Sequence, residues 1–324
     1  DLEISLRYRT GTADWFKVSS PGVLVVPADK LASIVREMTG ETLDLRAEEG
    51  YLVLANDRDV FKILTAGEED FPVLATPQKE AAWQLPAAEL VSLIGLTGFA
   101  CAKERTRYAL NGILFDFRQG GLSLVATDSR RLSLVSQPAA VGSPSRSPKL
   151  ETIVPLKGLS LLAKAGWKPE EEVRVALEDN QIFFCSGALT LGSRLLEGKF
   201  PNYEEVLPAS LPVTVEIPTA PFLGAVKRAS LMASEDSRAV RLSLEKNRLV
   251  LQARSHQHGE ARVDLALTYQ GAAREIGFNP DYLLDFLKLV RTEKVTLSLS
   301  DQNSPGLFRA GPHHTYLVMP VCLD

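Results

Sequence analysis

The stretch YALNGILFDFRQGGLSLVATDSRRLSLV, residues 108–135, predicts two strands joined by a Gly-Gly turn. Apolar and polar residues alternate along it with the period of two that is typical of half-buried strands. The apolar positions are Ile113, Phe115, Phe117, Leu122, Leu124 and Ala126. Gly120 and Gly121 allow the positive φ that a tight hairpin needs. A polar segment, Thr127–Arg131, then ends the second strand, and its composition alone favours a turn over a functional site.

The overall composition sets the first limits on function. With 324 residues, 45% of them hydrophobic, the chain can bury a large core and is expected to form two or three domains. A net charge of −4 excludes a DNA reader with a global positive field, so any nucleic-acid contact must be local. Three widely separated cysteines and the lack of a long apolar run indicate a cytoplasmic protein. The chain begins on Asp1 within a predicted strand, so we expect that the natural protein starts earlier.

A unit of strand, proline and amphipathic helix recurs along the chain. Each proline is predicted to begin a helix, where its fixed φ and missing backbone N–H are tolerated. The five prolines are Pro27, Pro86, Pro155, Pro218 and Pro280, at spacings of 59, 69, 63 and 62 residues. Five units at near-constant spacing predict a protein built from repeats.

A second repeat has twice that period. The pairs Phe71-Pro72 and Phe200-Pro201 lie 129 residues apart, and hairpins with turn residues Gly50, Asn180 and Asn247 recur around them. These boundaries predict three domains, at residues 1–79, 80–208 and 209–324, each made of two half-units. The first domain is shorter than the others by about one half-unit, so six half-units would complete the set.

The predicted helices differ in charge from the rest of the chain. The windows 155–168 and 218–233 have net charges of +3 and +2, while the windows 27–38, 86–103 and 280–291 are neutral. Because the whole chain is at −4, the residues outside these windows sum to −9. Two interpretations stay open. The helix faces are simply solvated, or the helices surround a polyanion and contact its phosphates without reading bases.

Seven segments, in order along nearly the whole chain, resemble the bacterial sliding clamp, the β subunit of DNA polymerase III. They are LNGILF, LVATDSRRLSLV, IVPLKGLSLL, KFPNYEEVLP, SRAVRLSL, IGFNPDYLLDFL and YLVMPVCL. DLEISL resembles the third strand of the family's first domain, so the preceding strands and the first helix are expected to be missing here. The resemblance implies an α+β fold of three repeated clamp domains. Each would place two helices on the inner face of antiparallel sheets, and a head-to-tail dimer would form a ring.

The implied function is that of a DNA polymerase processivity factor and not of an enzyme. A homodimeric ring would encircle duplex DNA, slide without sequence specificity and tether its partners. The implied partners are double-stranded DNA, the replicative polymerase, the clamp loader and repair proteins, with no cofactor and no membrane. The alternative is a clamp paralogue, or a repeat-built interaction scaffold without a DNA role.

The resemblance also implies where DNA and the second copy would be contacted. The candidates for DNA contact are Lys157, Lys164, Lys168, Lys227 and Arg228 on the helices, and Lys103, Arg105, Arg107 and Tyr108 in the loop before LNG. The candidates for the dimer interface are Phe61 and Ile63 in the first domain and Leu231 and Met232 in the third. The competing interpretation of these last four is that they are ordinary core residues.

By the same resemblance, partner peptides insert apolar anchors into a shallow pocket between the second and third domains. The matching residues are Leu110, Thr127, Ser129, Arg130, Arg131, Leu132, Pro201, Val206, Asn279, Tyr282, Pro305, Leu317, Val318, Met319, Pro320, Val321, Cys322 and Leu323. The aliphatic residues would form a dry floor, with Thr127 and Arg131 at the rim to set the direction of the peptide.

This chain departs from the family pattern inside that pocket. The family usually has Thr-Asp-Gly-His-Arg-Leu where Ser129 and Arg130 stand here, and Met-Pro-Met-Arg-Leu where Val321 and Cys322 stand. Branched valine is less adaptable than methionine, and Cys322 removes a cation. We therefore expect partner peptides to bind with a shifted preference.

Enzyme motifs are absent from the sequence. The histidines, His256, His258, His313 and His314, have no HExxH spacing or cysteine partner, so no metal site is expected. No GxSxG, P-loop or dinucleotide fingerprint occurs either.

Overall fold

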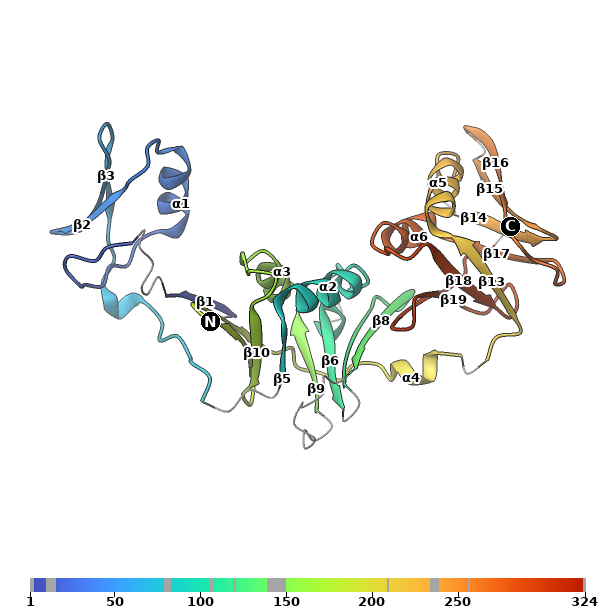
Figure 1. The fold of residues 1–324 in the computed structure, drawn as a ribbon, viewed down its shortest axis with the longest axis horizontal. Coiled ribbons are helices and arrows are strands. Elements are labelled where there is room, and N and C mark those ends of the chain that lie inside the picture. The colour runs from blue at the N-terminus through green and yellow to red at the C-terminus, as the bar shows by residue number, and fades with distance from the viewer. Residues whose placement is uncertain are drawn as a thin grey trace.

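The computed structural model describes nine stretches of the chain, residues 3–9, 16–78, 83–104, 108–118, 121–138, 150–208, 210–233, 239–255 and 257–322. The chain forms an open arc of three lobes, with helices along the concave side and sheets behind them (Figure 1). None of the helices in these stretches is long and apolar enough to cross a membrane.

Five helices follow the five prolines, as the repeat predicted. They are α1 (Ala28–Glu37), α2 (Ala87–Gly98), α3 (Leu156–Ala163), α5 (Thr219–Ser230) and α6 (Pro280–Leu287). Four of the prolines are the residue just before the first helical turn, and Pro280 is the first residue of its helix. A proline at either place begins a helix without losing a hydrogen bond, because the first backbone N–H groups have no partner inside the helix.

The opening stretch lies at the centre of an eight-stranded antiparallel sheet. In spatial order its strands are β13 (Val213–Pro218), β18 (Lys294–Leu299), β19 (Gly306–Ala310), β20 (His314–Val318), β8 (Arg131–Pro138), β7 (Gly121–Thr127), β6 (Gly112–Arg118) and β9 (Leu150–Pro155). The predicted hairpin is confirmed, with Gly121 at φ 145° and Arg118 paired to it. A Cβ at Gly121 would overlap the carbonyl oxygen of Gln137, so only glycine fits there.

Burial of the hairpin differs from the expectation. A half-buried strand was predicted, but β6 is buried on both faces from Gly112 to Phe117. Side chains on one face pack under the helices, and the other face is covered by the segment that leads into the short helix α4 (Tyr203–Val206). Periodicity reports which residues share a face, but it does not report what covers that face.

The remaining strands form three further sheets. The five-stranded sheet has the order β1 (Ile4–Tyr8), β12 (Leu189–Arg194), β11 (Gln181–Ser186), β10 (Glu172–Leu177) and β5 (Trp83–Pro86). The four-stranded sheet has the order β16 (Gly259–Ala266), β15 (Arg248–Ser255), β14 (Val240–Glu245) and β17 (Arg274–Phe278). The three-stranded sheet has the order β2 (Asp44–Glu48), β3 (Tyr51–Ala55) and β4 (Val60–Leu64). Two single turns of 3-10 helix complete the described elements, η1 (Glu68–Asp70) and η2 (Tyr108–Asn111).

The apolar core is unevenly distributed over the three lobes. Large clusters fill the middle lobe under α2 and α3 and the last lobe under α5 and α6. In the last lobe, the buried Phe308 ring lies within 6.4 Å of the rings of Phe222, Phe278, Phe286 and Tyr316. In the described part of the first lobe only three buried apolar residues, Leu52, Leu54 and Ile63, form a core cluster, and α1 has no buried residue. Apolar burial therefore stabilises the second and third lobes far more than the first.

Candidate binding site between the middle and third lobes

The middle and third lobes share one sheet because β8 pairs with β20. Leu132 lies opposite Leu317. Both side chains belong to an apolar cluster on the sheet face away from the helices, which is called the outer cluster below. Leu110 lies in the same cluster, so three of the residues predicted for the partner pocket are brought together. Leu307 of β19 also lies in this cluster but was not predicted from the sequence. The alternation of side chains along β19 places it on the face opposite to that of Phe308, which was the available signal.

Arg131 and Val318 are paired next to them but point to the opposite face, because successive residues of a strand alternate. Val318 belongs to the core of the third lobe. The Arg131 side chain is only 4% exposed. The expectation that Arg131 lies at the rim of the pocket is therefore wrong, since the side chain is buried between two lobes.

The Arg131 guanidinium joins the two lobes through a full set of partners. It donates to Asp128 Oδ2 (2.9 Å), to Asp285 Oδ2 on α6 (2.7 Å) and to the carbonyl oxygen of Phe99 (2.9 Å). It also lies over the Tyr282 ring, with the guanidinium carbon 4.4 Å from the ring centroid. Burial opposes the charge and is the largest single effect, but the hydrogen bond to Asp285 and the interactions with Tyr316 and Asp128 together outweigh it and raise the pKa of Arg131 above its ordinary value. The side chain is thus a permanent cation held between the middle and third lobes.

The polar turn before Arg131 is held by its own side chains. Thr127 is 7% exposed, and its hydroxyl donates to the carbonyl oxygen of Arg131 (2.6 Å), so it does not stand at the rim either. Asp128 Oδ1 accepts from the backbone N–H groups of Arg130 (2.9 Å) and Arg131 (3.0 Å). Ser129 has φ 76°, in the left-handed region that favours glycine. A glycine would adopt this turn without strain, whereas Ser129 adopts it at a cost in strain.

The remaining residues predicted for the pocket differ in their contacts and in their exposure. The backbone N–H of Met319 donates to the carbonyl oxygen of Arg130 (2.8 Å), and that of Val321 donates to Gly277 (2.9 Å). Met319 and Val206 are 39% and 45% exposed, so they offer apolar surface. Ser129, Arg130, Pro201 and Cys322 are exposed, while Asn279, Tyr282, Pro305, Pro320 and Val321 are half-buried. Leu323 lies outside the described residues.

The cations predicted to contact DNA on α3 and α5 belong to helices, or directly follow a helix, on the concave side of the arc (Figure 1). Lys157 belongs to α3, Lys164 and Lys168 follow that helix, and Lys227 and Arg228 form the last turn of α5. All five are exposed, as is Lys103 after α2. Arg105, Arg107 and the side chain of Tyr108 lie outside the described residues.

The four candidates for the dimer interface separate into two kinds. Leu231, at the end of α5, is 79% exposed, and Phe61 on β4 is 38% exposed. Ile63 is 6% exposed and packs in the first lobe's own core, and Met232 is half-buried against the core of the third lobe. Ile63 is therefore a core residue in this chain, and Phe61 and Leu231 are the two that offer free apolar surface.

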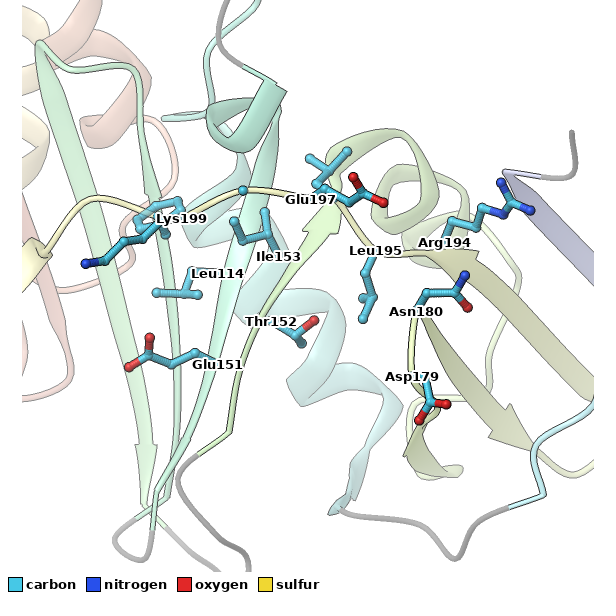
Figure 2. A pocket seen from close by; sticks show the side chains of 13 residues that line it. Leu114, Glu151, Thr152, Ile153, Asp179, Asn180, Arg194, Leu195, Glu197 and Lys199 are labelled. Carbon is cyan, nitrogen blue, oxygen red and sulfur yellow. The ribbon is translucent and has the colours of Figure 1, made fainter.

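A separate cavity of about 490 Å³ lies in the middle lobe, between β9 and the turn before β11 (Figure 2). In Figure 2, Leu114 and Lys199 stand on one side of it, and Asn180 and Arg194 stand on the other. None of the residues predicted for the partner pocket lines this cavity. Its lining contains both acidic and basic side chains, so charge does not select one class of ligand.

No catalytic or metal-binding constellation occurs within the described stretches. They contain no group of three or more His, Cys, Asp or Glu side chains placed to hold a metal ion. Ser133 and His314 are hydrogen-bonded (3.0 Å) but buried, and the Ser133 hydroxyl donates to the carbonyl oxygen of Leu96. Burial raises the pKa of Cys101 to about 12, so this thiol is not a nucleophile. His256 lies outside the described residues.

His314, on β20 at the seam between the lobes, makes stability depend on pH. Burial lowers its pKa from 6.5 to about 4. Above pH 6.5 the imidazole is neutral in the folded and the unfolded chain, whereas between pH 6.5 and 4 only the unfolded chain binds the proton. The free energy of unfolding is expected to fall by roughly 2–3 kcal/mol between pH 8 and pH 4.5 through this group. Urea unfolding at the two pH values should show a smaller fall for His314→Gln. His313→Gln, at the exposed neighbouring position, provides the control. If the free energy of unfolding falls equally with pH in His314→Gln and His313→Gln, then His314 is not the cause of the pH dependence.

Comparisons with known proteins agree with the resemblance seen in the sequence. Residues 84–202 match the model of the DNA polymerase III beta subunit, central domain, and residues 204–322 match that of its C-terminal domain. The beta sliding clamp of Pseudomonas putida is 34% identical, with 100% of this chain and 87% of the relative covered. The beta sliding clamp of Escherichia coli K12 is 33% identical with the same coverage.

Comparison with solved structures gives the same family. The crystal structure of the DNA polymerase sliding clamp from Pseudomonas aeruginosa has a TM-score of 0.91 at 35% identity, with 100% of this chain and 88% of that chain covered. The sliding clamp from Bacillus subtilis has a TM-score of 0.91 at 25% identity, with 99% and 87% covered. Fold and matches together define a DNA clamp, a class of protein that is not catalytic. The chain belongs to the family of bacterial beta sliding clamps and is a processivity factor of DNA polymerase III.

Proposed function

We propose that two copies of this chain close head to tail into a ring around duplex DNA. The ring slides along the DNA without reading its sequence. The observation that carries this proposal is the shape of the single chain, an arc whose concave side bears the helices (Figure 1). The arc is also open at both ends. Among the described strands, β4 in the first lobe pairs with β3 alone, and β16 in the third lobe pairs with β15 alone. Open edge strands are templates for pairing with another chain.

The charge distribution supports DNA inside the ring. The helices α3 and α5 lie on the concave side (Figure 1) and have exposed cations, while the residues outside the helix windows sum to −9. Phosphates would be attracted to the inner side and repelled by the rest of the surface. Contacts with phosphates alone carry no sequence information, which suits sliding.

We further propose the domain limits 1–79, 80–208 and 209–324. Support comes from the apolar clusters, each of which lies within one of these ranges, apart from the outer cluster at the β8–β20 seam. The sheets cross the proposed limits, since β1 pairs with β12 and β8 pairs with β20. The three domains are therefore joined by backbone hydrogen bonds as well as by linkers.

The proposed partners are the replicative polymerase, the clamp loader and repair proteins, which bind through short peptides at the outer cluster and the tail. Buried Leu132 and Leu317 support the floor of this surface, and exposed Val206 and Met319 offer apolar contacts. Apolar anchors of a peptide would bury there, with the exposed polar turn at Ser129 beside them. The proposed location is the cytoplasm, which rests on family membership.

A test of topology checks the ring. After loading by a bacterial clamp loader with ATP, the protein is expected to stay on a nicked circular plasmid through gel filtration and to leave it when the plasmid is linearised. Retention depends on closure and not on affinity, so it should survive salt that screens phosphate contacts. Loss of the protein from the circle and the linear form alike, or a chain that stays monomeric, would instead favour the scaffold or paralogue without a DNA role.

A further inference from the structure

A buried carboxylate ties the end of the second domain, residues 199–208, to the central sheet; this segment leads to the third domain and is called the linker below. Asp116, on β6, is fully buried. Its Oδ2 accepts from the hydroxyl of Tyr203 on α4 (2.6 Å) and from Arg118 Nε (2.8 Å). Arg118 also donates to Glu204 Oε1 (2.6 Å) and to the hydroxyl oxygen of Tyr203 (3.1 Å). Four side chains from two distant segments thus form one network.

The Arg118 guanidinium and the Tyr203 hydroxyl of this network both keep their protons at physiological pH. Burial, followed by the hydrogen bond to Asp116, raises the pKa of Tyr203, so its hydroxyl stays protonated and donates. The hydrogen bond to Asp116 is the main reason that the pKa of Arg118 is raised. Asp116 Oδ1 has no hydrogen-bond partner among the described residues. The carboxylate therefore depends on Tyr203 and Arg118 for its compensation, which makes the place of Tyr203 strongly determined.

Little else holds the linker. No backbone hydrogen bond connects residues 199–208 to another element in the described part of the chain, apart from the bonds inside α4 itself. Phe200 and Tyr203 pack into the outer cluster and are 8% and 7% exposed. Apolar packing tolerates small shifts, whereas a hydrogen bond to a buried carboxylate does not. The Tyr203 hydroxyl is thus the most specific anchor of this segment.

The anchored tyrosine stands between the two linker residues that are predicted for the partner pocket. Pro201 precedes it by two residues, Val206 follows it by three, and both are exposed. A shift of Tyr203 would move these two side chains relative to Leu132 and Leu317, which stand on rigid strands. We propose that Asp116 and Tyr203 are positioning residues that hold the linker wall of the pocket at the right distance from its floor. This inference rests on the proposed peptide site.

The test compares two single changes in the full-length chain. Tyr203→Phe keeps the ring in the apolar cluster and removes only the hydroxyl, while Glu204→Gln removes an ion pair whose carboxylate is 56% exposed. The probe is the clamp-binding peptide of the source organism's replicative polymerase, measured by calorimetry. Tyr203→Phe is expected to weaken binding about tenfold, and Glu204→Gln to stay within about twofold. Amide hydrogen exchange should accelerate in residues 200–208 for Tyr203→Phe and stay unchanged in β8 and β20.

A second variant keeps the inference testable if Tyr203→Phe fails to fold. Asp116→Asn keeps the shape of the side chain and an acceptor, and it is expected to weaken peptide binding in the same direction. The double variant should bind no more weakly than the weaker of the two single variants, since both act through one bond. Wild-type protein that does not bind the peptide would refute the proposed pocket. Wild-type binding together with equal affinities for Tyr203→Phe and Glu204→Gln would refute the positioning role alone.

Discussion

Replacing Arg131 by methionine is expected to lower the free energy of unfolding by about 3 kcal/mol. The change keeps the length of the side chain but removes the cation that faces Asp128 and Asp285, and it leaves the carbonyl oxygen of Phe99 without its donor. Removing one partner of a buried pair costs more than the pair contributes, because the other charge stays behind. The expected loss stays near the low end of that range because the Asp285 side chain is 39% exposed.

The neighbouring arginine offers a matched control. Arg130 has the same chemistry one residue earlier, but its side chain is exposed. Arg130→Met is expected to change the free energy of unfolding by no more than about 0.5 kcal/mol. Arg131→Lys should fall between the two, because lysine keeps the charge and loses the planar fork that reaches several acceptors. Urea unfolding of the three variants measures this order, and equal stability of Arg130→Met and Arg131→Met would show that the cation between the lobes contributes nothing.

Replacing Leu231 by glutamate is expected to convert the proposed dimer into a folded monomer. The side chain is 79% exposed in the single chain, so the change should leave the thermal midpoint within a few degrees. In a closed ring the carboxylate would be buried against apolar surface of the first domain, and the dimer should weaken by at least about a hundredfold. Sedimentation velocity measures the assembly, and plasmid retention should be lost with it.

Leu161 provides the comparison for this second prediction. It is also an exposed leucine, 49% exposed, but it stands on α3 in the middle of the arc and far from either end. Leu161→Glu is expected to dimerise like the wild type. A Leu231→Glu variant that remains dimeric at the same concentration would place ring closure elsewhere.

Several features of the fold were predictable because their causes are local. A proline at the start of a helix acts through its own φ and its own missing N–H, and all five predicted starts are confirmed. The hairpin at Gly121 is local in the same sense. Repeated local patterns, read in order, were also enough to predict the clamp family, which the comparisons confirm.

The predictions that failed concern whether a side chain is buried and which distant residues bury it. Arg131 and Thr127 were expected at a rim, yet Arg131 is buried, with Asp285, 154 residues away on α6, bonded to its guanidinium. Ile63 was expected at an interface, but it packs into the core of its own lobe. The Asp116 pair was not predicted at all, because its partner Tyr203 is 87 residues away.

The amino-acid sequence by itself determined the hairpin within residues 108–135, the helix starts and the membership of the clamp family, since each depends on neighbours in the chain or on a pattern repeated along it. Only the tertiary structure decided which face of β8 holds the cation, which apolar residues remain exposed at the ends of the arc, and what anchors the linker. Burial and pairing depend on segments that meet only after folding, so a pattern along one strand cannot report what packs on its two faces.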